Sequence, residues 1–330
     1  MKNERFLLGG LIALSLVCLV AACFLGSTPM GPARILAALF GNGDAGDQLV
    51  IWQIRLPRAV AAFVVGIALG ASGAALQGLL RNPLAEPGVL GVSASAALGA
   101  TFSLYYGLSF LGPWTLPFAA IAGAMLATGL IAAAAIRNQS VVTLILIGVG
   151  LSSFAGALMS LLMNLAPNPF SLSDMINWML GSVANRSFDD LALAAPFLVL
   201  GLGILMATRR GLSALTLGEE AASGIGLNLT RQRLAVVIGA GLTTGAAVSI
   251  AGAIGFVGIV APHLVRPFTN HDPARSILPA ALLGGIILTI ADIGVRLAPT
   301  SSELKLGVVA ALIGAPAFAW IAAQRGRHND

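Results

Sequence analysis

The chain has 330 residues, of which 57% are hydrophobic and only 9% are charged, and its net charge is +5. With a mean hydropathy of +0.92, this composition excludes an ordinary soluble domain, because the apolar surface is too large for one protein core and lipid must cover much of it. The positive charge does not indicate nucleic-acid binding, because aromatic residues make up only 6% of the chain and are not interleaved with basic patches. An arginine excess in a membrane protein usually reports orientation.

The first apolar segment covers residues 6–26 and follows two basic residues. It ends Val20-Ala21-Ala22-Cys23, which is similar to a lipoprotein cleavage box, so a cleaved signal is the alternative to a membrane span. The rest of the chain is more membrane-like still, which favours the span. Cys18 and Cys23 would lie about 140° apart around a helix. We therefore interpret them as small apolar side chains and not as a disulfide or a metal pair.

A polar run with two prolines, Gln77–Gly88, follows the second apolar segment. Residues 59–76 before it and 88–104 after it carry no charge. In a membrane protein such a loop must lie at a surface, be buried in protein or line a water-filled path. We therefore expect this loop to be part of the working machinery of the protein.

A helix needs about 20 apolar residues to cross the hydrocarbon core of a bilayer. By this criterion the chain has ten candidate spans, and the eighth is short and the least certain to cross fully. The predicted fold class is all-α: a polytopic membrane protein of about ten transmembrane helices in one domain, residues 1–330. The candidate spans cover residues 6–26, 58–80, 89–107, 114–136, 141–165, 189–208, 232–253, 255–268, 276–297 and 306–324.

The basic residues indicate how these spans are oriented. If the N-terminus is inside, twelve basic residues lie at cytoplasmic ends and six at outer ends, which predicts that both termini are cytoplasmic. The inner set is Lys2, Arg5, Arg81, Arg137, Arg209, Arg210, Arg231, Arg233, Arg266, Arg275, Arg325 and Arg327, and the outer set is Arg34, Arg55, Arg58, Arg186, Arg296 and Lys305.

The chain contains a weak internal repeat. The segment that starts at Arg58 is similar to the one that starts at Arg231, with an offset of 173 residues. Since the two arginines would lie on opposite sides of the membrane, the copies would run in opposite directions, as in the inverted repeats of transporters. Chance matching in a chain rich in alanine and glycine is the alternative. Small residues such as Gly66, Gly70 and Gly73 would let helices approach closely.

No enzyme signature is present in the sequence. Neither lysine, Lys2 or Lys305, follows the glycine of a phosphate-binding loop, and the three scattered histidines do not suggest a metal site. Asp292 is the one acid well inside a span, and Arg296 lies four residues later on the same helix face. We expect these two side chains to pair, with a proton path as the alternative.

The segment between the sixth and seventh spans, about residues 212–228, is too polar to span and too apolar for a free linker. We expect two short helices broken near Gly224, on the cytoplasmic side by the charge count. A short amphipathic helix pair there would suit the docking of a motor subunit. Passive contact with the lipid surface is the alternative.

Four separated motifs resemble one protein family. They are similar to motifs of the permease subunit of ABC importers for iron-siderophores, haem and cobalamin. The motifs occur in the same order as in that family, and the resemblance covers nearly the whole chain. The motifs are the Gln77–Gly88 loop with Leu90-Gly91-Val92-Ser93, then Leu217–Ala222, Gly255–Arg266 and Gly307–Pro316.

This resemblance implies a function and a set of partners. The chain would have no enzymatic activity and no cofactor or metal of its own, and would move an iron(III)-siderophore or related metal chelate across the bacterial inner membrane. Haem or cobalamin is the alternative cargo. The partners would be a second copy in a homodimer, two cytoplasmic ATPase subunits that bind ATP and Mg, and a periplasmic substrate-binding protein. An ion-coupled secondary carrier is the alternative from a different class, and it predicts paired acids inside the membrane.

The resemblance also implies roles for three sets of residues. The first couples to the ATPase, the second meets acidic residues of the binding protein, and the third forms the inner gate. Ordinary snorkelling at helix ends is the alternative for the second set. In the third set, valines stand where relatives can carry small hydroxyl residues, which makes the constriction more apolar. The sets are Leu217, Gly218, Glu219, Glu220, Ala221, Ala222, Gly224 and Gly226; Arg55, Arg58 and Arg296; and Asn82, Pro83, Leu84, Val141 and Val142.

Overall fold

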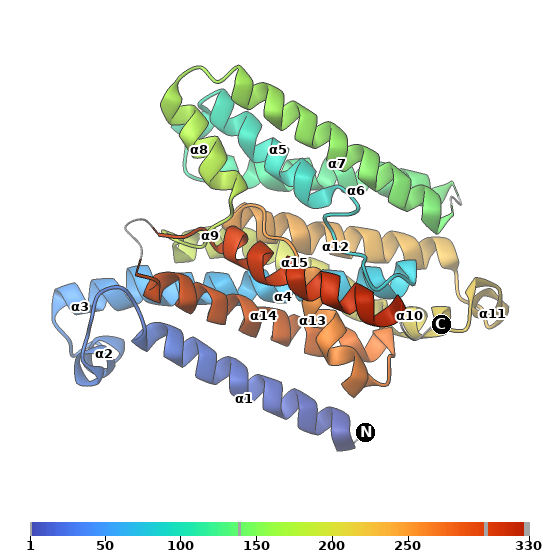
Figure 1. The fold of residues 1–330 in the computed structure, drawn as a ribbon, viewed down its shortest axis with the longest axis horizontal. Helices are drawn as coiled ribbons and strands as arrows, with labels where there is room; N and C mark the ends of the chain where they lie inside the picture. The colour runs from blue at the N-terminus through green and yellow to red at the C-terminus, as the bar shows by residue number, and fades with distance from the viewer. Residues whose placement is uncertain (1, 138–139, 300–302, 327–330) are drawn as a thin grey trace.

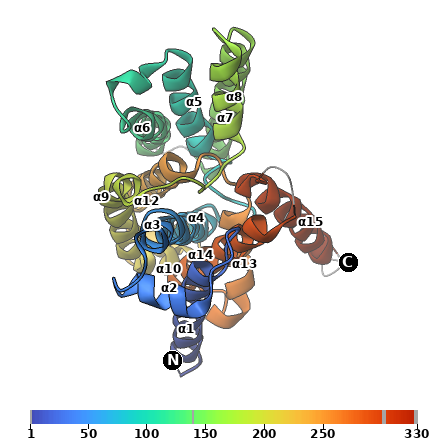
Figure 2. The same cartoon turned by 90° about the vertical axis from the view of Figure 1, so that its left-hand side faces the viewer.

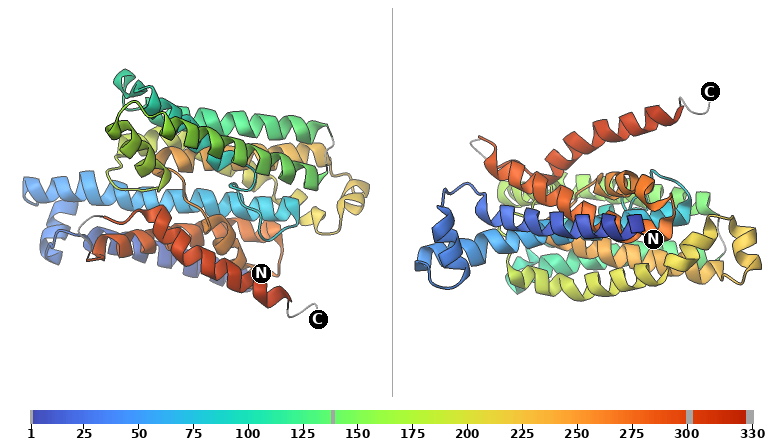
Figure 3. Two further views of the ribbon diagram at one scale, coloured as in Figure 1. Left: turned by 45° about the horizontal axis from the view of Figure 1, so that its top comes forward. Right: turned by 90° about the horizontal axis from the view of Figure 1, so that it is seen from below.

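The computed structural model describes residues 2–137, 140–299 and 303–326, and every regular element in these ranges is a helix. The long helices run roughly along one axis (Figures 1 and 3). At one end lie α2 (Pro32–Leu39) and α3 (Ala45–Leu49), and at the other lie α10 (Arg209–Leu215) and α11 (Glu219–Gly224). We call these the α3 end and the α11 end.

Within the described residues, seven helical segments are long and apolar enough to cross a membrane. Two of the ten predicted spans are shorter helices in the structure, since α5 has 14 residues and α13 has only nine. At 1.5 Å per residue, α13 reaches about 14 Å, which is less than half of the hydrocarbon core. The seven segments are α1 (Lys2–Phe24), Ala45–Leu80 including α4 (Leu56–Leu80), α6 (Thr115–Ile136), α7 (Val141–Asn164), α9 (Phe188–Ala207), α12 (Leu229–Ala251) and α14 (Pro273–Leu297). The other predicted spans correspond to the short helices α5 (Val92–Tyr105) and α13 (Val257–Val265) and to the 21-residue α15 (Leu306–Gly326).

Two elements at the α3 end are helices that the sequence did not predict. One is the α2–α3 pair, and the other is α8 (Pro169–Met179). Asn168 caps the N-terminus of α8, because its side-chain oxygen accepts a hydrogen bond from Ser171 N. α2 and α8 are too short to span a membrane, and α3 is the start of the long helical segment Ala45–Leu80. Together they cover the α3 end of the longer helices (Figure 1).

The core of the molecule is formed by α4, α12 and α14, around which the other helices pack (Figure 2). In the most apolar windows of α4 and α12, 78% and 83% of residues are buried, although these windows would suit lipid by composition. In α7 and α9 only 17% are buried. The outer helices therefore offer their apolar faces to lipid or to another chain, while α4 and α12 are enclosed by protein.

Small residues allow α4 to pack directly on its neighbours. A methyl group at Gly66 would overlap the carbonyl oxygen of Gly284 on α14, and one at Gly73 would overlap that of Gly258 on α13. Gly70 lies against α14 in the same way. The predicted role of these three glycines in close helix packing is confirmed.

The internal repeat has the inverted arrangement that its arginines predicted. Figure 1 shows α4 running from the α3 end to the α11 end, and α12 running the opposite way. After each of them the chain leaves the helical conformation and then forms a short helix, α5 after α4 and α13 after α12.

The N-terminal helix α1 packs along α14. Leu11 and Cys18 of α1 form a small apolar cluster with Ile286. Cys18 and Cys23 are both buried and not joined to another cysteine, in agreement with their interpretation as apolar side chains.

Candidate functional site

The polar loop that follows α4 is packed against the start of α13. The Phe256 N–H donates to a carboxylate oxygen of Glu86 at 3.2 Å. Phe256 directly precedes α13 and has φ 68°, in the left-handed region that bulky residues rarely adopt. The Glu86 carboxylate is thus placed at the N-terminus of α13, where the helix dipole favours negative charge.

Glu86 is also partly shielded from water. Burial raises the pKa of its carboxyl to about 7, and the hydrogen bond from Phe256 acts in the opposite direction. Its charge therefore changes close to neutral pH, which is unusual for a glutamate.

The same short helix is tied to α4 both in its first turn and directly after its last residue. The side-chain amide of Gln77 on α4 makes two hydrogen bonds: its nitrogen donates to the backbone carbonyl of Gly258 at 3.2 Å, and its oxygen accepts from Arg266 at 2.6 Å. Glu86 and Gln77 belong to one sequence motif, and Gly258 and Arg266 to another. The two motifs are far apart in the sequence and form one polar junction in the structure.

A cleft of about 260 Å³ opens beside this junction at the α11 end. Its wall includes Arg81, Pro83 and Arg266, together with His271 and Thr216. The loop after α4, the end of α13 and the start of the α11 region therefore share one polar surface.

The predicted gate residues lie at the α11 end in two separate places. Asn82 closes a tight turn by accepting from Leu84 N at 3.0 Å, and Pro83 lines the cleft. Val141 packs partly on the core, whereas Val142 is 65% exposed at the start of α7. Both groups lie at one end of the molecule, and their role as a gate stays a prediction.

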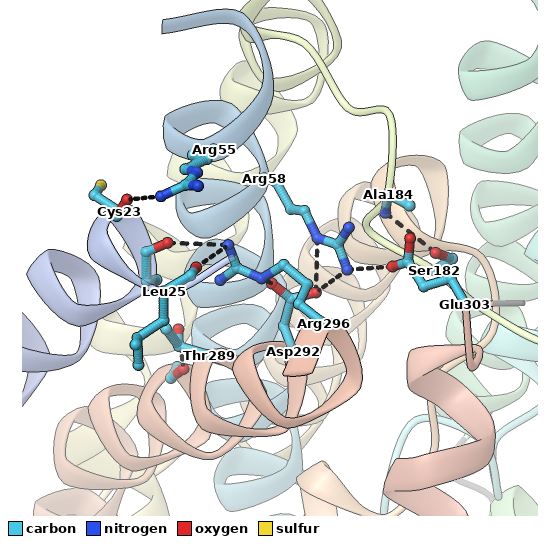
Figure 4. A network of polar contacts seen from close by, with 12 residues as sticks. Cys23, Leu25, Arg55, Arg58, Ser182, Ala184, Thr289, Asp292, Arg296 and Glu303 are labelled. Atoms are coloured by element: carbon cyan, nitrogen blue, oxygen red, sulfur yellow. Dashed lines mark hydrogen bonds and ion pairs between the residues drawn. The ribbon is translucent and has the colours of Figure 1, made fainter. Parts of the chain in front are cut away.

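A cluster of charges lies at the α3 end (Figure 4). Arg58 donates twice to one oxygen of Asp292, at 2.9 and 2.7 Å, and also pairs with Glu303. Arg296 lies 3.1 Å from the other oxygen of Asp292. The predicted pairing of Asp292 with Arg296 is confirmed, and Arg58 of α4 is a second partner that the sequence reading missed.

The other predicted docking arginine belongs to the same region. Arg55 donates to the carbonyl oxygens of Cys23 and Phe24 at 2.9 and 3.1 Å, and Arg296 reaches those of Ala22 and Leu25. These carbonyls end α1 and have no partner within the helix. The two guanidinium groups therefore fasten the end of α1 to α4 and α14.

Burial limits what these arginines can offer to another protein. Arg55 is 4% exposed and Arg58 is 8% exposed. The structure does place the three predicted docking arginines at one end of the molecule, but their side chains are turned toward internal partners. Docking of a binding protein on them stays a prediction.

The predicted coupling segment protrudes at the α11 end as two short helices (Figure 1). The prediction of a break near Gly224 is wrong, because Gly224 is the last residue of α11 and the break is at Gly218. Gly218 has φ 100°, which a residue with a side chain rarely adopts. This conformation lets the chain turn between α10 and α11.

The first acid of α11 is fixed to α12. A guanidinium nitrogen of Arg233 donates to both carboxylate oxygens of Glu219, at 2.8 and 2.9 Å. Ala222 is fully buried beneath the segment, whereas Leu217 and Ile225 are each 68% exposed. The segment is therefore an anchored projection with apolar side chains on its outer surface.

Comparison with known proteins identifies the family. Residues 13–324 match the FecCD transport family. The chain belongs to this family. It is 40% identical over 293 residues to the uncharacterized ABC transporter permease protein YvrB of Bacillus subtilis (strain 168), covering 87% of this chain and 82% of YvrB. It is 38% identical over 329 residues to the vitamin B12 import system permease protein BtuC of Salmonella typhi, covering 99% of this chain and 97% of BtuC.

A solved structure has the same fold as this FecCD permease. It is an inward-facing conformation of an ABC transporter of the metal-chelate type, with a TM-score of 0.84 and 28% sequence identity. The match covers 97% of this chain and 99% of the other. The predicted family and the all-α, polytopic fold class are both confirmed, and the relatives are transport permeases and not known enzymes.

Sequence reasoning missed two interactions in this FecCD permease. It identified the loop after α4 but gave Glu86 no role, although an acid between two prolines in an uncharged region must have a buried partner or reach water. It also left Asp292 with one partner. A carboxylate in a membrane span has two oxygens to satisfy, and the hydrogen bonds to one of them come from Arg58 on another helix, which helical spacing could not reveal.

Proposed function

We propose that this chain is the membrane subunit of an importer driven by ATP hydrolysis on a partner, and that its cargo is an iron(III)-siderophore or a related metal chelate. The observation that carries the proposal is the α10–α11 projection, which is anchored through Glu219 and exposes Leu217 and Ile225 at one end of a FecCD permease. The sequence has no phosphate-binding loop, so the energy would have to arrive through such a contact.

The proposed orientation places the α11 end in the cytoplasm and the α3 end outside the inner membrane. The excess of basic residues at the α11 end supports this orientation, and it puts both termini in the cytoplasm. The α10–α11 projection then faces the compartment in which ATP is available.

The proposed partners follow from the surfaces at each end. Two ATPase subunits, with their ATP and Mg, would bind the projections of two permease copies in a homodimer. The weakly buried α7 and the exposed Leu312 and Ile313 of α15 supply apolar surface for the second copy and for lipid. A periplasmic binding protein would dock at the α3 end, on the surface that Arg55, Arg58 and Arg296 support from beneath.

The proposed inner gate is formed by the Asn82–Leu84 turn and by Val141 and Val142. Support comes from their common location at the α11 end and from the cleft beside Pro83. This mostly apolar constriction would close the path by side-chain packing and would not bind the cargo.

A vitamin B12-type corrinoid is the second candidate cargo. It is favoured by the match to a vitamin B12 import permease over 329 residues, which leaves almost no part of either chain unmatched. An ion-coupled carrier has less support, because the one acid well inside a span, Asp292, is paired with two arginines.

The test is transport by the permease with its ATPase and binding protein in proteoliposomes. We expect uptake to require internal ATP and to be lost, together with stimulated ATPase activity, when Glu219 and Glu220 are both changed to Ala. Asp189→Ala, which removes an exposed carboxylate at the other end, is the control and should transport normally. Uptake by the permease alone, driven by an ion gradient, would refute the proposal.

A further inference from the structure

A polar pocket of about 330 Å³ lies at the α3 end, apart from the junction and the gate residues and beside the charge cluster, since Ser182 and Ala184 of its lining lie next to Glu303 (Figure 4). It is an open pocket lined by α8 and the loop that follows it, by Lys305 before α15, and by single residues of α5, α6 and α12. Its polar lining comes from Asp174, Asn177, Trp178, Ser182, Arg186 and Lys305.

Arg186 has an unusual environment in this pocket. In the described part of the chain, its Nε is enclosed by protein and has no hydrogen-bond partner, while the residue as a whole is partly buried. The guanidinium carbon lies over the face of Trp178, at 5.2 Å from the ring centre. Burial lowers the pKa of Arg186, and the carboxylate of Asp190 only partly offsets this. A guanidinium in such a place without a carboxylate or carbonyl partner is costly.

Trp178 provides a second unsatisfied donor at the same site. Its side chain is more than nine-tenths buried, and its indole N–H has no acceptor among the described residues. Tryptophan N–H groups usually find a partner when they are buried. Two neighbouring donors without acceptors therefore point to a ligand that supplies the acceptors.

The charges around the pocket indicate the chemistry of that ligand. Arg186 and Lys305 contribute two positive charges and Asp174 one negative charge, so the lining carries a net charge of +1. A carboxylate or phosphate group fits this arrangement, because a planar guanidinium can bind two of its oxygens at once.

We infer that this pocket is a transient binding site for an oxyanion group of the cargo, with Arg186 and the indole N–H of Trp178 as its donors. The inference rests on the proposed function for its cargo, and it adds that chelates bearing carboxylate or phosphate groups are favoured at the outer part of the path. Occupation moves the guanidinium off the indole ring, which exposes the Trp178 N–H to the ligand.

The test uses the permease alone in nanodiscs, so it does not depend on transport. Tryptophan is replaced by fluorotryptophan, and the fluorine NMR signal of Trp178 is assigned by its loss in Trp178→Phe. The probes are three diamagnetic gallium chelates: anionic gallium citrate, the neutral gallium complex of ferrichrome, and the cationic gallium complex of desferrioxamine B. We expect only gallium citrate to shift the Trp178 signal with saturation.

Variants identify the donor. Arg186→Gln should weaken the response to gallium citrate about 10- to 100-fold, since it removes a charged hydrogen-bond donor, and Arg186→Lys should keep part of it. Arg137→Gln, at an exposed position beyond the other end of α6, is the matched control and should leave the response unchanged. An unchanged melting temperature for Arg186→Gln separates lost binding from misfolding.

Three outcomes would overturn the inference. The first is a Trp178 signal that none of the chelates moves. The second is an equal response in Arg186→Gln. The third is a signal that is already shifted in nanodiscs of anionic phosphatidylglycerol but not in those of phosphatidylcholine, because the acceptor would then be a lipid headgroup. Failure of ATP-driven uptake would refute the proposed function and leave a saturable, Arg186-dependent shift intact.

Discussion

Arg58 on α4 and Asp292 on α14 form a buried ion pair, with two hydrogen bonds to one carboxylate oxygen and a side-chain exposure of 10% and 1%. The residues are 234 positions apart in the sequence, so the pair joins the first half of the chain to the last quarter. Arg296 lies 3.1 Å from the other oxygen, and its Nη1 donates to two carbonyls at the end of α1. One carboxylate thereby organises three helices at the α3 end.

Removing this carboxylate should destabilise the protein strongly. Asp292→Asn leaves the buried Arg296 without a carboxylate partner and leaves Arg58 with only the more exposed Glu303. We expect a loss of about 3–5 kcal/mol in the free energy of unfolding. Because Cys18 and Cys23 are buried, a thiol-reactive fluorescent dye reports the unfolding of the purified permease on heating. Arg34→Gln breaks the pair of Arg34 with Asp47, in which Arg34 is 63% exposed, and should lower the melting temperature far less. Equal melting curves for the two variants would contradict the role of the cluster.

The order of apolar segments was enough to predict the fold class. Segments of about 20 apolar residues can form only membrane helices, and the arginines at the ends of α4 and α12 indicated opposite directions. The sequence could not show that α4 and α12 are enclosed by protein while α7 and α9 are exposed. All four are apolar around their whole circumference, so a hydrophobic periodicity that would mark a buried face is absent.

The candidate site was predictable only in part, for a related reason. Asp292 and Arg296 are neighbours on one helix, and helical spacing alone predicted their contact. The contacts of Glu86 with Phe256 and of Gln77 with Arg266 join motifs that are far apart in the sequence. Spacing holds no information about such pairs. The break in the coupling segment was misplaced because the segment holds three glycines, and it is Gly218 and Gly226, not Gly224, that adopt a positive φ.

The contact between α4 and α14 makes a prediction about a single methyl group. Gly66→Ala places a carbon against the carbonyl oxygen of Gly284, and neither backbone can move without separating the helices. We expect the free energy of unfolding to fall by about 1–3 kcal/mol, as for other overpacked cores, and the yield of folded protein to be lower. The control is Gly129→Ala on α6, where nothing lies within 4 Å of the new carbon. In that open position alanine favours the helix by about 1 kcal/mol, so the control should be neutral or stabilising.

The pair of Arg233 with Glu219 predicts that α11 can be loosened without altering its outer surface. Arg233→Gln removes the charged donor that reaches both oxygens of Glu219. We expect faster amide hydrogen exchange in Glu219–Gly224 and weaker stimulation of the partner ATPase, because a mobile projection transmits force poorly. Arg231→Gln, at an exposed position two residues earlier on α12, is the control. Unchanged exchange in α11 of Arg233→Gln would show that Ala222 and the turn at Gly218 hold the helix by themselves.

Glu86 predicts a pH dependence of stability near neutrality. Burial raises its pKa from 4.5 to about 7, so between these values the folded protein holds a proton that the unfolded chain has released. Stability therefore falls as the pH rises through this window, by no more than about 3 kcal/mol for a shift of this size. Glu86→Gln does not titrate, and its amide oxygen can still accept from Phe256 N–H. We expect this variant to melt at a higher temperature than the wild type at pH 8 and at a similar one at pH 5. The same difference between variant and wild type at both pH values would show that Glu86 does not titrate in the folded protein.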